Sequence, residues 1–221
     1  SVSVIRLSVD LEQAFGIPFR VADIRTHSTV RQLEALTASA EAEEDREILP
    51  DYPVTQTQMG IYIECVSDPG TVTYNIPVLI RLSDRLDPDR LLSAIRTALD
   101  AHPYVKTTLF ADAEGNIRAR RNDAAELTVN HITRDKLPAA DELVRPFRLL
   151  DSPLCRIALY ETRDGNYLFM DFHHIISDGT SENILLADIS KAYAGQTVAP
   201  EKYTGFEAAL DEESARTTDR Y

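Results

Sequence analysis

The 221-residue chain has no tryptophan, two methionines and only two cysteines. Cys65 and Cys155 lie far apart and form no CxxC pair, so they indicate neither a metal site nor a disulfide scaffold. We therefore expect two buried free thiols, a protein that works in the reducing cytoplasm, and no bound metal.

Long apolar runs are also missing. No stretch approaches the roughly 20 apolar residues that a membrane-spanning helix needs. The first residues lack the basic region and apolar core of a signal peptide. Because the chain starts at Ser1 rather than Met, we expect an excised or processed piece. Because it stops at Tyr221 within a helical pattern, we expect more protein to follow.

Basic residues are outnumbered. There are 23 Lys and Arg against 36 Asp and Glu, which gives a formal net charge of −13 at pH 7. This acidity is spread along the chain and argues against nucleic acid and anionic membranes as partners. The basic run 118–121 is the exception. It follows a turn signal at 112–116, so we expect it on a solvated strand edge.

The patterns divide the chain into three parts. Residues 1–40 show apolar residues at helical spacing, with one helix ending at Gly16 and another that Ser28 caps. Forty residues are few for an independent core. Residues 41–51 are acidic and end near prolines, which is typical of an extended, solvated linker. Residues 52–221 form the main domain.

This main domain alternates between strand and helix patterns, which predicts an α/β fold. Strands are expected at 74–82, 105–110, 116–121, 127–132, 154–162 and 167–173. Helices are expected at 56–64, 88–99, 137–144, 181–193 and 205–216. Pro88 suits the first position of its helix, with Asp87 as the cap. The turn at 163–166 predicts a hairpin.

The most informative segment is His173-His174-Ile175-Ile176-Ser177-Asp178-Gly179. It follows a predicted strand and precedes a predicted helix. An imidazole titrates near neutral pH, and a helix N-terminus offers N–H donors to developing negative charge. Because side chains alternate along a strand, His173 and His174 face opposite sides, and only one can point into a given site.

The segment matches HHxxxDG, a pattern that is rare by chance in a chain of this composition. It resembles the motif of condensation domains in nonribosomal peptide synthetases. Chloramphenicol acetyltransferase and other coenzyme A-dependent acyltransferases share that fold and a similar histidine motif. The segment 52–62 resembles the opening motif of condensation domains, and 101–108 resembles their second motif. There, Ala101, Pro103 and Lys106 replace the family's Arg, Glu and Arg.

The N-terminal part resembles a peptidyl carrier domain from its phosphopantetheine-bearing serine onward, at 1–7, 15–17 and 27–30. This resemblance implies a 4′-phosphopantetheine arm on Ser1, a carrier remnant at 1–40, and the N-terminal lobe of a two-lobed chloramphenicol-acetyltransferase-like fold at 52–221. The missing C-terminal lobe, upstream and downstream carrier domains and an adenylation domain are the implied partners. The piece alone is expected to be inactive.

The implied reaction is amide formation, in which an acceptor aminoacyl thioester's amine attacks a donor thioester. By resemblance His174 is the catalytic histidine. It positions the amine, takes its proton, or does both. His173 is expected to be a core histidine with local hydrogen bonds. No serine or cysteine stands where a protein nucleophile would act, and Ser177 is expected to be a turn residue.

The end of the motif has supporting roles in this interpretation. Asp178 either caps the following helix or forms a salt bridge, and in the family its partner would align with Lys106. Gly179 is expected to keep the substrate path open. The N–H groups of Gly179, Thr180 and Ser181 are candidate oxyanion donors.

Other functions stay open. The residues 56–58 favour the subtype that joins two L-residues. An epimerisation domain also follows a carrier and has a similar histidine motif, but its helix usually continues with Ser-Trp, and this chain has no tryptophan. A heterocyclisation domain would have aspartates in place of the histidines. A non-catalytic module that only docks carrier domains is the third alternative.

Overall fold

The computed structural model describes Leu7, Leu11, Ile24 and residues 29–39, 47–201 and 203–218. The chain divides into two compact units, Ser1–Ile48 and Leu49–Tyr221. In the first unit, helix α3 spans Val30–Ser39, and Thr29 Oγ1 accepts the Gln32 N–H at 3.4 Å. Ser1, Ser28 and most of the helix expected before Gly16 lie outside the described residues.

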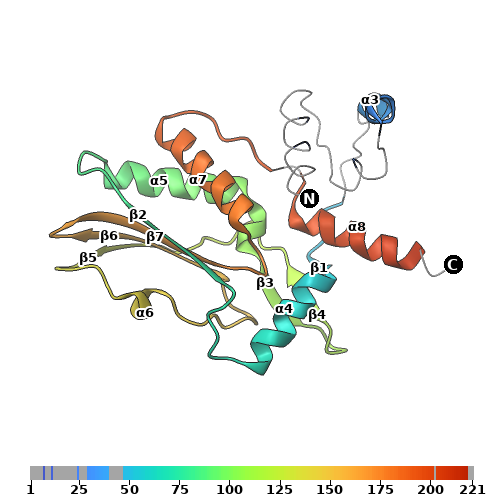
Figure 1. Cartoon of the computed structure of the whole chain (residues 1–221), viewed down its shortest axis with the longest axis horizontal. Helices are drawn as coiled ribbons and strands as arrows, with labels where there is room; N and C mark the ends of the chain where they lie inside the picture. Colours follow the sequence, from blue (N-terminus) through green and yellow to red (C-terminus); the bar gives the residue numbers. More distant parts are fainter. Residues whose placement is uncertain are drawn as a thin grey trace. The chain divides into compact units, whose positions relative to one another are not determined.

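The second unit contains two sheets (Figure 1). A three-stranded antiparallel sheet has the order β1 (Asp51–Pro53), β4 (Ile117–Arg120), β3 (Thr108–Ala111). A four-stranded sheet has the order β2 (Asn75–Arg81), β7 (Gly165–His173), β6 (Cys155–Thr162), β5 (Val129–Thr133), with only β5 and β6 parallel. The predicted mixed α/β class is confirmed.

Helices cover both faces of the four-stranded sheet. The helical segments of this unit are α4 (Gln56–Ser67), α5 (Pro88–Ala101), the 3₁₀ turn η2 (Pro103–Lys106), α6 (Ala140–Leu143), α7 (Gly179–Tyr193) and α8 (Gly205–Thr218). Helices α5 and α7 lie together on one face, and α6 lies on the other (Figure 1). The main core between the sheet and α5 and α7 includes Ile95, Leu99, Met170, Phe172 and Leu185.

Local signals set the start of α5 and the β6–β7 hairpin as the sequence predicts. Asp87 accepts hydrogen bonds from the N–H groups of Asp89 and Arg90, and Pro88 occupies the first turn. In the hairpin, Thr162 pairs with Gly165, whose φ of 135° is a conformation that side chains disfavour. With β6 on one side and β2 on the other, β7 lies in the interior of its sheet.

A second core holds the histidine motif in place. Ile175 and Ile176 are buried in it together with Tyr52, Leu109 and Phe206. These partners come from β1, β3 and α8, elements that are far apart in the sequence. The loop between β7 and α7 is therefore fixed by packing, although its first residue, His174, remains exposed.

Two predicted elements differ in detail, and one strand was not predicted. The strand expected at 105–110 begins only at Thr108, because Pro103 starts a 3₁₀ turn in which Thr107 N–H donates to the Tyr104 carbonyl. The helix expected at 137–144 is a single turn, and its N-cap residue, Ala139, has no side-chain bond to offer. Strand β1 was not predicted, since it is three residues long and includes Pro53.

The expectation for the basic run is wrong. Strand β4 lies between β1 and β3 rather than at an edge. The positive charges of this run have acidic partners: Arg118 contacts Asp51, and Arg121 contacts Asp123 at 2.8 Å. Carboxylates from neighbouring segments satisfy these guanidinium groups, and the strand can occupy the centre of its sheet.

Candidate active site

The motif begins where β7 leaves the sheet. The backbone N–H of His173 donates to the Leu154 carbonyl at 2.9 Å, and that of His174 donates to the Tyr74 carbonyl at 2.7 Å. The second bond extends the pairing with β2 by one residue. His174 is thus held by its backbone next to a strand, a more rigid support than a free loop.

His173 points into the protein. It is 3% exposed, its Nδ1 accepts the Ile175 N–H at 3.2 Å, and Phe147 contacts its ring edge-on. Burial is the largest cause that lowers the pKa of His173, to about 4, so the ring is neutral at pH 7. This is the buried histidine with local hydrogen bonds that the sequence predicts.

The hydrogen bond from the Ile175 N–H also decides whether His173 can act as a base toward Cys65. The Sγ of Cys65 lies 3.6 Å from the Nε2 of His173. Because Nδ1 accepts a hydrogen, neutral His173 carries its own hydrogen on Nε2 and cannot take the thiol proton. Burial also raises the pKa of Cys65. The pair is a packing contact and not an activated nucleophile.

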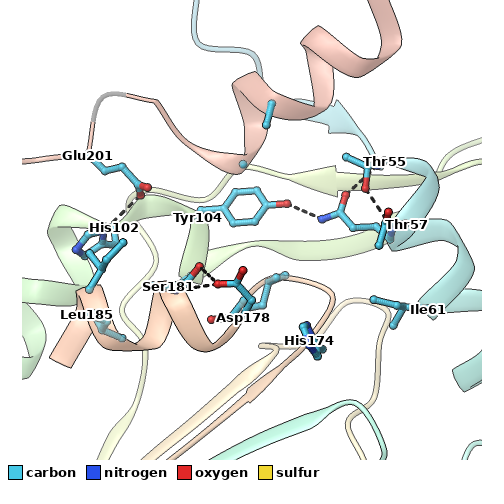
Figure 2. Close-up of a pocket in the computed structure, with 17 residues that line it drawn as sticks. Thr55, Thr57, Ile61, His102, Tyr104, His174, Asp178, Ser181, Leu185 and Glu201 are labelled. Atoms are coloured by element: carbon cyan, nitrogen blue, oxygen red, sulfur yellow. Dashed lines mark hydrogen bonds and ion pairs between the residues drawn. The ribbon is translucent and has the colours of Figure 1, made fainter. Parts of the chain in front are cut away.

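His174 points the other way, into a cavity of about 430 Å³ (Figure 2). The lining comes from three segments that the sequence singles out: the N-terminus of α4, the 3₁₀ turn η2, and the motif with the first turn of α7. Glu201, before α8, and Gly205 and Ala208 of α8 complete the lining. The opening motif, the second motif and the histidine motif therefore meet around one exposed imidazole.

Gln58 joins these three segments. Thr55 and Gln58 form a capping box at the start of α4, in which Gln58 Oε1 accepts the Thr55 N–H at 2.9 Å. Gln58 Nε2 donates to the Ile175 carbonyl at 2.8 Å and to the Tyr104 hydroxyl at 2.6 Å. The T-x-x-Q spacing could have indicated the cap, but no sequence signal indicates the two long-range bonds.

Asp178 caps α7, one of the two roles expected for it. Its Oδ1 accepts the Ser181 N–H at 2.8 Å and the Ser181 hydroxyl at 2.7 Å. A carboxylate at this position also suits the positive end of the helix dipole. The Ser181 N–H is consequently occupied, which corrects its place among the oxyanion donors. Gly179 and Thr180 remain at the helix N-terminus, and a Cβ on Gly179 would meet no atom within 4 Å.

The expected salt bridge between Lys106 and Asp178 is wrong. Lys106 is 6% exposed, and its Nζ donates to Asp100 Oδ1 at 2.7 Å and to the Asp123 carbonyl at 2.8 Å. The reason is that each group already has a local partner. The Lys106 ammonium in η2 lies beside the end of α5, while the Asp178 carboxylate caps the helix that follows it. Lys106 supports the fold at a place different from the one predicted.

Glu182 was not predicted. It is 5% exposed, and its Oε1 has no hydrogen-bond partner among the described residues. Burial, followed by the negative charges of Asp171 and Asp178, raises the pKa of Glu182 to about 7, while His174 acts in the opposite direction. A buried glutamate in a helical pattern gives no signal in the sequence, because its spacing matches that of any polar helix position.

His102 forms the far wall of the cavity. Its Nε2 lies 2.9 Å from Asp188. Its Nδ1 lies 3.3 Å from Glu201 (Figure 2). The hydrogen bond to Glu201 is the largest cause that raises the pKa of His102, and Asp188 adds to it against the effect of burial. Both ring nitrogens are engaged, so His102 ties α5 to α7 and does not act on a substrate.

Within residues 29–39, 47–201 and 203–218, no group of three His, Cys, Asp or Glu side chains could hold a metal ion. No helix in the same part of the chain is long and apolar enough to cross a membrane.

A family model for the condensation domain matches residues 49–217. The chain belongs to the condensation-domain family. This match covers the second compact unit, including the whole cavity around His174. The family resemblance of the motif segments is thus supported across the domain that contains them.

This condensation domain is similar to parts of nonribosomal peptide synthetases. It is 30% identical over 209 residues to surfactin synthase subunit 1 from Bacillus subtilis (strain 168), covering 90% of this chain and 6% of that protein. It is 29% identical over 208 residues to tyrocidine synthase 3 from Brevibacillus parabrevis, covering 90% of this chain and 3% of that protein. The chain thus spans only a small part of these relatives.

Solved structures give the same fold. The X-domain from teicoplanin biosynthesis is 26% identical with a TM-score of 0.66, over 80% of this chain and 41% of that chain. The first condensation domain of the CDA synthetase is 17% identical with a TM-score of 0.60, over 77% of this chain and 48% of that chain. The condensation domain described here thus matches less than half of each solved domain.

Proposed function

We propose that this condensation domain forms amide bonds between carrier-bound substrates in nonribosomal peptide synthesis. The α-amino nitrogen of an acceptor aminoacyl thioester attacks the carbonyl carbon of a donor acyl or peptidyl thioester. A C–N bond forms, the C–S bond breaks, and the donor's thiol leaves. The attacking nitrogen loses one proton, and the thiolate gains one. The reaction needs no nucleophile from the protein.

His174 carries this proposal, because it is the motif histidine exposed to the cavity while His173 is buried. An α-amine has a pKa of about 7.7–8.0, so part of it is already neutral at pH 7. A base is then needed chiefly to remove a proton from the tetrahedral intermediate, which suits a neutral imidazole. Holding both thioesters in one site supplies much of the acceleration.

The same proposal assigns roles to the N-terminal part of the chain and names its partner domains. Ser1 would carry the phosphopantetheine arm on a carrier remnant at 1–40, joined by the linker 41–51. Upstream and downstream carrier domains, an adenylation domain and the second lobe would be the partners, in the cytoplasm. Because the family's active site lies between two lobes, the piece 1–221 alone would be inactive.

The experiment uses the extended native protein with both carriers loaded, in heavy water, and compares wild type with His174→Ala. Mass spectrometry follows the thioester products. Amide product that the variant no longer forms supports condensation. Deuterium at the donor α-carbon without amide product would instead identify an epimerisation domain and overturn the proposal.

Docking without catalysis is the second candidate. The observation that favours it is the similarity to the teicoplanin X-domain, which has also been solved in a complex with OxyB. Under this alternative, the loaded protein binds a partner domain but forms no amide, and His174→Ala changes neither result. The intact His174 at an open cavity supports condensation in preference to docking.

A further inference from the structure

The hydrogen bond between Gln58 and Tyr104 has a defined direction. A carbonyl can only accept a hydrogen and a backbone N–H can only donate one. The bonds to the Ile175 carbonyl and the Thr55 N–H therefore fix which end of the Gln58 amide is nitrogen. One Nε2 hydrogen goes to Ile175 and the other to Tyr104, so the tyrosine oxygen accepts in this bond.

The hydroxyl proton of Tyr104 is left for another partner. A phenol has one O–H donor, and within residues 47–201 and 203–218 no acceptor takes it. Burial raises the pKa of Tyr104 to about 12, so the group keeps its proton throughout the neutral range. It is a neutral donor whose acceptor is missing from the described protein.

The ring that carries this hydroxyl is fixed. Phe206 contacts it edge-on with 4.7 Å between ring centroids, and the backbone of Gly205 packs against its outer edge. Tyr104 lines the same cavity as His174, and Figure 2 shows its hydroxyl directed toward the α4 side of that cavity. Through Gln58, the hydroxyl is also linked to the residue that follows His174.

We propose that Tyr104 is a further catalytic residue, whose O–H donates a hydrogen bond to a carbonyl oxygen of a carrier-bound thioester in this cavity. This inference rests on the proposed amide-forming function. As the amine attacks, the carbonyl oxygen gains negative charge, and an oriented neutral donor stabilises that charge without having to reorganise. No proton is transferred by Tyr104, so the balance of the reaction is unchanged.

The direct test is isotope-edited infrared spectroscopy on the extended native protein with one carrier loaded at a time. The donor thioester carbonyl carries ¹³C in one sample and the acceptor thioester carbonyl carries it in another. We expect one of the two C=O bands to shift to lower frequency in wild type and to return in Tyr104→Phe. A shift in either sample supports the proposal and identifies the carbonyl. The same band positions in wild type and variant would overturn it.

Kinetics give a second test with a matched control. Tyr52→Phe removes a hydroxyl from the other tyrosine that packs on Phe206, also at 4.7 Å, but Tyr52 does not line the cavity. We expect Tyr104→Phe to lower the rate of amide formation about 100-fold at saturating carrier, with carrier affinity unchanged, while Tyr52→Phe retains the rate. Equal losses in both variants would mean a packing role and overturn the proposal.

The two proposals fail separately. If wild type forms no amide, the proposed function fails whatever the infrared result. If wild type forms amide but Tyr104→Phe keeps the rate, only the role of Tyr104 fails. Site-specific 3-fluorotyrosine at position 104, a more acidic donor, should increase the carbonyl shift, and a shift that does not respond would also count against the hydrogen bond.

Discussion

Gly205 lies against the ring of Tyr104: a Cβ added at position 205 would stand 2.6 Å from Cε1 and 2.7 Å from Cε2 of the tyrosine. We expect Gly205→Ala to displace the ring and to lower the free energy of unfolding by about 1–3 kcal/mol. Urea unfolding measures this. Gly60→Ala, in α4, is the control, since its Cβ would meet no atom within 4 Å and alanine favours a helix. Similar results for the two variants would contradict the prediction.

Lys106 and Asp178 should act independently, because each has its own partners. Asp178→Ala should cost about 1 kcal/mol through the lost cap of α7. Lys106→Met should cost more, because the Asp123 carbonyl loses its donor. In a double-mutant cycle read by urea unfolding, we expect a coupling energy below about 0.5 kcal/mol. A larger coupling energy would contradict this prediction and support the Lys106–Asp178 salt bridge that the sequence suggested.

Glu182 should make the domain less stable as the pH rises. Burial raises its pKa to about 7 from an ordinary value of 4.5, so the unfolded chain releases this proton first. Stability attached to the protonated group is fully present below about pH 4.5 and is lost as the pH rises toward 7. Glu182→Gln, which cannot ionise, should stabilise the domain at pH 8 by up to about 3 kcal/mol and change little at pH 4. Chemical unfolding at both pH values checks this, and equal effects at the two would refute it.

His102 should also stabilise the domain less as the pH rises, but here the protonated form is the charged one. Its pKa is raised by Glu201 and Asp188, so the imidazolium stabilises the fold at low pH and this contribution is lost as the pH rises through the raised pKa. His102→Gln should cost about 1–2 kcal/mol at pH 5.5 and less at pH 8.5. His131→Gln, which loses a partly exposed contact to Glu161, is the comparison. A cost for His102→Gln that does not fall with pH would argue against the charged form.

Local features of the fold could be predicted from the sequence because their causes lie within a few residues. Asp87 and Pro88 start α5, and the turn at 163–166 forms the β6–β7 hairpin, as expected. The strand, loop and helix of the histidine motif follow the same logic. The starts differ by two residues, since β7 begins at Gly165 rather than at Tyr167 and α7 at Gly179 rather than at Ser181.

The rest of the site depends on contacts that no local pattern encodes. Gln58 is 46 residues from Tyr104 and 117 from Ile175, yet one amide joins all three. The partner of Lys106 was predicted by alignment with a family pattern, and this chain satisfies its ammonium in another way. Tertiary contacts of this kind are set by the packing of whole elements, which the spacing of residues does not specify.

The position of β7 also has a consequence for biosynthesis. This strand is the last of its sheet to be synthesised, yet it lies between β2 and β6. Among the described strands, β2 pairs only with β7, so during synthesis β2 has no strand partner until the β6–β7 hairpin has emerged. The Tyr74 carbonyl receives the His174 N–H only then. A nascent chain therefore gains this backbone support of His174 in the same late event that closes its sheet.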